Sequence, residues 1–322
     1  MLTSASLTLK QHRFEVGAAA LAAFVLGFSA LIVTFRLNSV AMPPGCFEAW
    51  IEGPGAVSPP DCANAMRLWL SINSNEASYV FGVMWVLPFM VGLIGGIPIV
   101  ARELEGGTAQ TAWFISPSRT RWLIRQLLPV LTLLGAATAF AAVGTAILET
   151  TQPRSVIEHL IVQGPPVVAR ALAAFGIGVL VGSVVGRSLP AFLVGMVLCA
   201  VVAWQAEPVR IGWLHARAVP LDHEITNGYS FGFAWRAPDG TLTPWNEDTF
   251  ARLVPAGAVA APEDGQQDFE DWLYAHGYEL VQLGVPDDVA RGWIPLEVAG
   301  MSLIGLGAIG AAAIAVNRRR PT

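Results

Sequence analysis

The chain has little charge. Charged residues make up 13% of its 322 residues and hydrophobic residues 54%, against about 25% and about 45–50% in an average soluble domain. So few charges cannot cover the surface of a globule of this size, which excludes an ordinary soluble fold. The net charge of −5, with no basic run besides residues 318–320, argues against nucleic-acid binding. The composition therefore indicates a multi-span protein of the lipid bilayer.

Lysine is almost missing. Lys10 is the only one, and Leu9 precedes it. A phosphate-binding loop of the type G-x-x-x-x-G-K-[ST] needs a lysine directly after a glycine. The chain cannot form that loop, so if ATP drives the protein, another polypeptide hydrolyses the ATP.

Six stretches are apolar and long enough to cross a bilayer core about 30 Å thick, which takes about 20 helical residues. Near the middle of each there is no Asp, Glu, Lys, Arg or His. Ion- and proton-driven carriers need ionisable groups at that depth, so this lack argues against a proton-coupled pump, an ion channel or an intramembrane protease. We predict an all-α integral membrane fold with spans at Phe14–Phe35, Tyr79–Ala101, Leu127–Leu148, Pro166–Gly186, Leu189–Trp204 and Trp293–Val316.

The distribution of basic residues predicts the orientation of these spans. If the N-terminus is cytoplasmic, that side holds ten of the 19 lysines and arginines but only three of the 24 acidic residues. An excess of basic residues is typical of cytoplasmic segments. We expect a multi-pass protein of the plasma membrane with both termini in the cytoplasm.

Only three cysteines are present, and two of them support this orientation. Cys46 and Cys62 lie in the first outside loop, 37–78, near the proline pairs at 43–44 and 59–60, whereas Cys199 lies in the fifth span. A disulfide between the first two is expected on the oxidising face and would contribute about 3 kcal/mol. Two free thiols are the alternative.

The long segment 205–292 is expected to form a small folded cap outside the membrane, because a structureless loop of this length is uncommon. Its net charge is −9, from five arginines and fourteen acidic residues. Residues 229–235, the turn at 238–240 and residues 241–243 predict a β-hairpin. Residues 268–283 have helical spacing, with Phe269, Trp272, Leu273 and Leu280 on the apolar face.

Two motifs suggest chemistry in this cap, and neither has a supporting context. Residues 228–232 fit the G-x-S-x-G pattern around Ser230, but a nucleophile elbow needs a strand, turn and helix within a large parallel sheet. His215, Asp222, His223 and Glu224 contain metal-binding residue types at a spacing that matches no established ligand pattern. We expect no catalytic residue and no metal site, and read both motifs as parts of the polar surface.

Glycines recur at a spacing of four in two spans. They are Gly92 and Gly96 in the second span, and Gly178, Gly182 and Gly186 in the fourth. Small residues at this spacing let helix backbones approach closely. We expect close helix packing, with a dimer contact as the alternative.

The segment 87–128 is the most informative part of the chain. A span interrupted by prolines ends at Ala101, continues with charged residues and breaks at Gly106 and Gly107. Thr108 is expected to cap a short helix over 109–115, and residues 116–118 break the chain again. The pattern predicts an amphipathic helical elbow on the cytoplasmic face, which transmits force only if a partner docks on it.

This segment resembles the permease subunit of type-2 ABC exporters, in particular their actinobacterial branch. The resemblance is strong over about 40 residues, and the six-span plan and long last outside loop extend it loosely. It departs at Ala109, Phe114 and Ile115, where the family often has polar residues. The matching positions are Pro88, Val91, Gly92, Gly96, Pro98, Ala101, Arg102, Glu103, Glu105, Gly107, Thr108, Ala112, Trp113, Ser116, Ser118, Arg119, Arg121, Trp122 and Leu123.

The resemblance implies a fold like that of the G-subfamily exporters and a dimer of permeases, most simply a homodimer, on separate ATP-binding subunits that hold ATP and Mg. Residues 1–13 would form an interfacial helix, 14–204 spans 1–5, 102–126 the cytoplasmic coupling region, and 293–322 the last span with a basic tail. The residues implied in coupling are Arg102, Glu103, Glu105, Gly107, Thr108, Trp113, Phe114, Ser118 and Arg119. Those implied along the translocation path are Phe81, Met84, Trp85, Phe89, Phe192 and Met196, with helix or lipid contact as the alternative.

We therefore expect a non-enzymatic membrane subunit that exports a hydrophobic or amphipathic compound, such as a drug, antibiotic, peptide or lipid-like molecule. Its expected partners are the bilayer, the ATP-binding subunit, a second permease and this substrate. The alternative is a sensory or resistance subunit whose cap binds a ligand and signals. An enzyme acting through Ser230 or His223 is a distant third interpretation.

Overall fold

The structure is a computed structural model and describes residues 9–47, 61–115, 118–152, 157–221, 228–244 and 266–319. The chain divides into two compact units, one built from the long helices and one that comprises mainly Pro208–Trp293. Three predicted features lie partly outside the described residues: residues 1–8 of the interfacial helix, the middle of the Cys46–Cys62 loop, and residues 222–224 of the metal-type motif.

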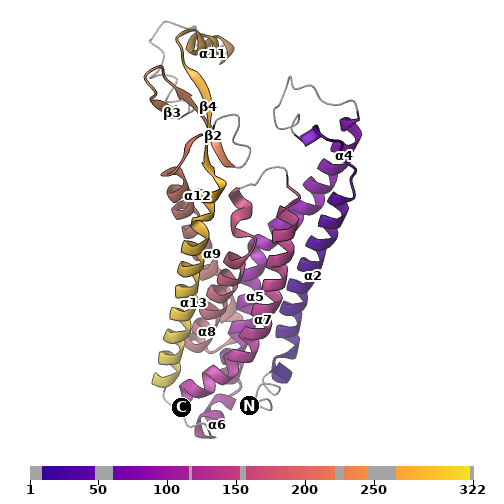
Figure 1. Cartoon of the computed structure of the whole chain (residues 1–322). Coiled ribbons are helices and arrows are strands. Elements are labelled where there is room, and N and C mark those ends of the chain that lie inside the picture. Colours follow the sequence, from indigo (N-terminus) through magenta and orange to yellow (C-terminus); the bar gives the residue numbers. More distant parts are fainter. Residues whose placement is uncertain are drawn as a thin grey trace. The chain divides into compact units, whose positions relative to one another are not determined.

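Six helical stretches are long and apolar enough to cross a membrane, which confirms the predicted six-span helical fold (Figure 1). The fifth prediction was too short, because α9 stays helical beyond its apolar part and through Pro208. The first unit contains α2 (Arg13–Asn38), α4 (Cys62–Ile72), the π-helical turn η1 (Asn73–Ala77), α5 (Ser78–Glu105), α6 (Thr108–Ile115), α7 (Arg119–Glu149), η2 (Ile157–Ile161), α8 (Pro165–Val185), and parts of α9 (Ser188–His215) and α13 (Trp293–Arg318).

The predicted first outside loop is partly helical. Residues 62–77 form α4 and η1, which continue directly into α5. Trp69 and Ile72 on α4 are buried and pack with residues of α2, so an amphipathic face holds this segment on the bundle. The predicted disulfide between Cys46 and Cys62 is present, with their Cα atoms 5.6 Å apart.

Helix α5 packs along α8, and α2 packs along α7. The predicted glycine spacing explains the first of these contacts. A Cβ atom at Gly92 would lie 2.5 Å from the carbonyl oxygen of Ala171, and one at Gly96 would lie 2.5 Å from that of Phe175. Both positions therefore need glycine, because backbone occupies the space that a side chain would fill.

Helix α13 contacts α8 in a similar way. A Cβ atom at Gly176 would lie 2.2 Å from the carbonyl oxygen of Gly305. Nearer the start of both helices, Nε of Arg170 donates a hydrogen bond to Oε1 of Glu297 at 2.7 Å. Both side chains are buried, so an ion pair and a glycine contact hold α13 on α8.

The second unit contains a four-stranded antiparallel sheet in the order β1-β4-β2-β3, formed by β1 (Val219–Leu221), β2 (Gly228–Arg236), β3 (Leu242–Pro244) and β4 (Glu279–Pro286). The predicted hairpin is confirmed as β2 and β3, and Asp239 in its turn accepts hydrogen bonds from the backbone N–H and hydroxyl of Thr241. These hydrogen bonds lower the pKa of Asp239.

The predicted helix over 268–283 is half wrong. Helix α11 (Gln266–Ala275) ends before Gly277, whose φ of 78° an ordinary side chain rarely adopts. Residues 279–286 then form β4, because there they pair with strands on both sides. A short helix, α12 (Asp287–Arg291), leads into α13.

Candidate functional site

The elbow between α5 and α7 is shaped by its chain breakers. Helix α5 ends with Gly106 as its C-cap, and Gly107 follows with a φ of 70°. Helix α6 then begins at Thr108, so the predicted short helix is present. At its far side, the hydroxyl of Ser118 accepts a hydrogen bond from the N–H of Arg121 at 3.1 Å and caps α7. The elbow is thus a short helix held between two defined helix ends.

Two charged residues at the end of α5 bind the N-terminal segment. Arg102 forms an ion pair with Glu15 in the first turn of α2. Glu103 is buried and accepts hydrogen bonds from the side-chain amide of Gln11 and the hydroxyl of Thr108. The hydroxyl of Thr108, the residue predicted to cap α6, thus donates to Glu103 at the end of α5. Figure 1 shows the start of α2 and the elbow at the same end of the helical unit.

His12 lies next to these groups and is only 1% exposed. Neither ring nitrogen has a hydrogen-bond partner among the described residues. Burial lowers the pKa of His12, and Arg102 lowers it further, although the carboxylates of Glu15 and Glu103 act in the opposite direction. The imidazole is therefore enclosed beside two carboxylates and a guanidinium, and its burial favours the neutral form.

Glu105 reaches a different helix. Its Oε2 atom accepts hydrogen bonds from the N–H of Ser188 at 3.2 Å and from the Ser188 hydroxyl at 3.1 Å. Ser188 is the first residue of α9. The carboxylate therefore occupies the N-terminus of α9, where an unpaired N–H group and the helix dipole favour a negative charge.

Arg119 connects the elbow to the last helix. Its guanidinium donates to the carbonyl oxygens of Val316 at 3.2 Å and Asn317 at 3.3 Å, at the end of α13. Asn317 in turn donates to the hydroxyl of Thr120 at 2.9 Å. The guanidinium also lies 4.5 Å from the centroid of the Trp113 ring, so α6, α7 and α13 meet at this residue.

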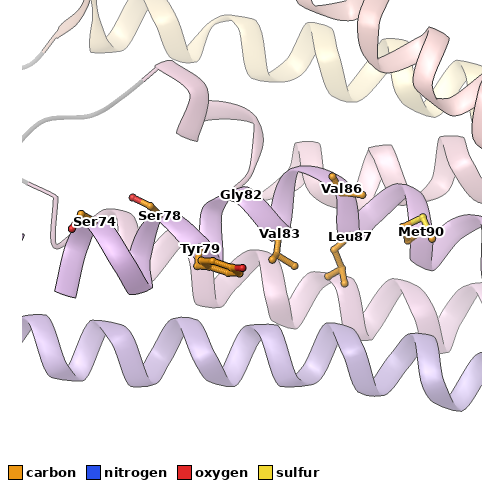
Figure 2. A pocket seen from close by; sticks show the side chains of 8 residues that line it. All are labelled: Ser74, Ser78, Tyr79, Gly82, Val83, Val86, Leu87 and Met90. Carbon is orange, nitrogen blue, oxygen red and sulfur yellow. The ribbon is translucent and has the colours of Figure 1, made fainter. Parts of the chain in front are cut away.

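An open groove of about 580 Å³ follows the first half of α5. Figure 2 shows its lining residues along η1 and α5, with two serine hydroxyls and the Tyr79 ring toward one end and apolar side chains toward the other. Five of them recur every fourth residue, which places them on one helix face. The lining residues are Ser74, Ser78, Tyr79, Gly82, Val83, Val86, Leu87 and Met90.

The sequence model of the family described as "ABC-2 membrane transporter related" matches residues 16–210, which is more than half of the chain. The chain belongs to this family. No characterised protein and no solved structure shows significant similarity to it. The protein is therefore a multi-pass membrane subunit of an ABC transporter, and its family implies an ABC ATP-binding subunit as partner.

The predicted coupling residues of this ABC-2 permease divide into two groups. Most of the charged and polar ones, including Arg102, Glu103, Glu105 and Arg119, contact other parts of the same chain. Trp113 is half-buried and packs edge-on against Trp122, with ring centroids 6.1 Å apart. Phe114 is 84% exposed. A role of each in contact with the ATP-binding subunit stays a prediction.

The predicted path residues lie in three environments. Phe81 and Met84 are buried in a cluster with residues of α2, α4 and α7. Phe89 is buried in another cluster, against which Phe192 of α9 packs. Trp85 and Met196 are 42% and 39% exposed. The structure thus brings Phe89 and Phe192 together and leaves Trp85 and Met196 accessible, while Phe81 and Met84 face neither an open surface nor the groove.

Sequence reasoning missed the groove and the partners of Glu105 and Arg119. The groove could have been predicted from the spacing of four between residues 74, 78, 82, 86 and 90. No local pattern indicates that Ser188 lies beside Glu105, 83 residues earlier.

Of the two chemical motifs, the structure describes the G-x-S-x-G segment, whereas residues 222–224 of the other lie outside the described residues. Residues 228–232 lie within β2, so Ser230 is not on the strand–turn–helix elbow of a hydrolase. Among the described residues, no group of three or more His, Cys, Asp or Glu side chains is placed to hold a metal ion.

Proposed function

We propose that this ABC-2 permease exports a hydrophobic or amphipathic compound, with α6 docked on the ATP-binding subunit in the cytoplasm. The observation that carries the docking proposal is the exposure of Phe114 on α6. An aromatic side chain that is 84% exposed on a short polar-flanked helix is suited to fill a pocket of a partner protein. The charged side chains around it are engaged within the chain, so the aromatic anchor provides the contact.

The conduit is proposed to form between two copies of the permease. Helix α9 presents a continuous apolar face with little cover from its own protomer, since only 17% of its most apolar window is buried. Trp85 and Met196 are accessible, and Phe192 packs on the cluster that contains Phe89. A second copy would close the α5 groove and this face into a path. The large apolar side chains that α9 exposes as far as Trp204 are Leu189, Leu193, Val194, Met196, Val197, Leu198, Val201 and Trp204.

The lining of the groove supports an amphipathic cargo. Most of its surface is apolar, and the hydroxyls of Ser74, Ser78 and Tyr79 are confined to one end. A ligand with an apolar body and one polar end would find partners for both. Flexible Met90 and the other aliphatic side chains tolerate ligands of different shape.

In this proposal the permease contributes binding and movement but no bond-making step. ATP with Mg on the partner subunits drives their closure, which displaces α6. The protomers then shift from an inward-open to an outward-open population, because nucleotide binding favours the second state.

Co-purification with the ATP-binding subunit tests the docking. Phe114→Ala should reduce the recovered partner at least tenfold, because it removes the aromatic anchor. Phe14→Ala is the matched control, since Phe14 is also a highly exposed phenylalanine, at 74%, on the first turn of α2. Unchanged recovery with Phe114→Ala would refute the docking proposal.

A second candidate function is supported by the folded unit 208–293. It has its own sheet and a core in which Trp235 and Leu273 are buried, as expected of a ligand-binding module that signals through the complex. ATP-driven uptake of a lipophilic fluorescent dye into inside-out vesicles separates the two functions. Uptake supports export, whereas ATP hydrolysis with no uptake of any dye in a chemically varied panel supports signalling.

A further inference from the structure

The side chain of Glu105 connects the elbow to α9. Oε2 of Glu105 accepts two hydrogen bonds from Ser188, one from its N–H and one from its hydroxyl. Glu105 is the last residue of α5, three residues before α6, and Ser188 is the first residue of α9. A carboxylate at the end of one helix thus caps the start of another.

The packing of α8 and α9 indicates what a displacement at this point would move. The most apolar window of α8 is 78% buried, whereas that of α9 is 17% buried. Helix α8 is held by close backbone contacts with α5 and α13. Helix α9 has few such contacts, so a pull at its end is opposed by little packing within the protomer.

The connection between α8 and α9 is suited to act as a hinge. It consists of Gly186 and Arg187, and Gly186 has a φ of 68°. The N–H of Gly186 closes α8 by donating to the carbonyl oxygen of Gly182 at 3.0 Å. Because α8 ends in a complete cap, α9 can change its angle without unwinding α8.

The other elbow contacts described above lead elsewhere. Arg102 and Glu103 bind the N-terminal segment, and Arg119 binds the end of α13. Of the elbow side chains described above, Glu105 is the one whose hydrogen bonds reach α9.

We propose that Glu105 is the positioning residue through which displacement of α6 is transmitted to α9. The inference rests on the proposed function and deepens it, because it assigns Glu105 to the connection between docking helix and conduit helix. Glu105 then acts through Ser188 and makes its essential contact inside the permease, not with the ATP-binding subunit.

The test measures movement of α9 in the complete complex with its ATP-binding subunit. In a Cys199→Ala background, spin labels are placed at Ile124→Cys on α7 and Val197→Cys on α9, two positions that are 54% and 62% exposed. One labelled permease per complex gives a distance within a single protomer. This distance is compared without nucleotide and with ATP and vanadate.

We expect Glu105→Ala to retain less than half of the nucleotide-driven change in this distance, while the recovered ATP-binding subunit stays within twofold of wild type. Glu105→Gln should keep most of the change, because its amide oxygen still accepts from Ser188. Ser188→Ala keeps the backbone donor and should give an intermediate value. Arg125→Ala, an exposed charge on α7 with no described contact, is the control and should behave as wild type.

Full movement of α9 in both Glu105→Ala and Ser188→Ala would overturn the proposal, as would a loss of the ATP-binding subunit in Glu105→Ala. If Glu105→Ala does not fold, the comparison of Ser188→Ala with Glu105→Gln decides. Failure of the proposed function has a different signature: the distance in the wild-type complex would not respond to nucleotide at all, and the link would then have nothing to transmit.

Discussion

Helices α8 and α9 are neighbours in the chain and equally apolar, yet they have opposite environments. Both reach a mean hydropathy of 2.0, but 78% of the window in α8 is buried within the protomer and only 17% in α9. Seven of the 21 residues of α8 are alanine or glycine, against six of the 28 residues of α9. In a bilayer, apolarity determines which segments span, and small residues determine which of them pack together.

The largest expected effect concerns the ion pair that holds α13 on α8. Arg170→Met leaves Glu297 as a charge without its guanidinium in a buried site, so we expect a loss of about 3–5 kcal/mol in the free energy of unfolding. The double variant Arg170→Met/Glu297→Met should recover more than half of this loss, because neither charge of the pair is then buried. Titration with SDS in mixed micelles measures both, and equal losses in the single and double variants would contradict the expectation.

Truncation of one apolar side chain on each helix compares the burial of α8 and α9 directly. Phe175 on α8 is 1% exposed, and Val197 on α9 is 62% exposed. Phe175→Ala should cost about 3 kcal/mol, near the low end for phenylalanine in a water-soluble core, because lipid also solvates apolar groups. Val197→Ala should change the free energy of unfolding by less than about 0.5 kcal/mol. Similar losses in the same SDS titration would show that α9 is buried in the isolated protomer.

Replacing a glycine with a larger residue tests whether its helix lies in close contact with a neighbouring helix. Gly96→Leu places a side chain against the backbone of α8 and should destabilise the protein by about 1–3 kcal/mol. Gly310→Leu on α13 is the control, because nothing lies within 4 Å of its added Cβ atom. Thermal unfolding in detergent should show a clear loss for the first variant and little change for the second. A tolerated Gly96→Leu would mean that α5 and α8 are not in close contact.

The smallest expected effect concerns His12, a buried polar residue that lies outside the apolar contacts between helices. The pKa of His12 is lowered in the folded protein, whereas an unfolded chain titrates near 6.5, so the unfolded state binds more protons in mildly acidic solution. The corresponding stability is present above about pH 6.5 and is lost as the pH falls toward the pKa of the folded state.

His12→Phe should therefore show a smaller decrease in melting temperature between pH 7.5 and pH 5.5 than the wild-type protein does. Carboxylates titrate in both proteins, so the difference between the two decreases is the quantity to compare. Equal decreases would mean that His12 is protonated equally in the folded and unfolded chains.

Local patterns predicted what depends on local physics. The six spans follow from runs of apolar residues, the elbow from Gly106, Gly107 and Pro117, and the hairpin from its turn residues. The helix predicted over residues 268–283 was half wrong because part of this segment depends on distant residues. Residues 279–286 are a strand only because β1 and β2 lie on either side of them. The path prediction chose Phe81 and Met84 by residue type and depth, although the face of α5 on which they lie packs into the protomer.

The sequence by itself determined that the chain crosses a membrane six times, that it has no phosphate-binding loop of its own, and that a helical elbow interrupts it after the second span. These properties depend on apolar length, on residue identity and on helix breakers that act on their nearest neighbours. The tertiary structure alone decided that α8 is enclosed and α9 is open, that Arg170 meets Glu297, and that Glu105 caps α9. Those relations join residues as many as 127 positions apart, and they depend on how helix faces fit together.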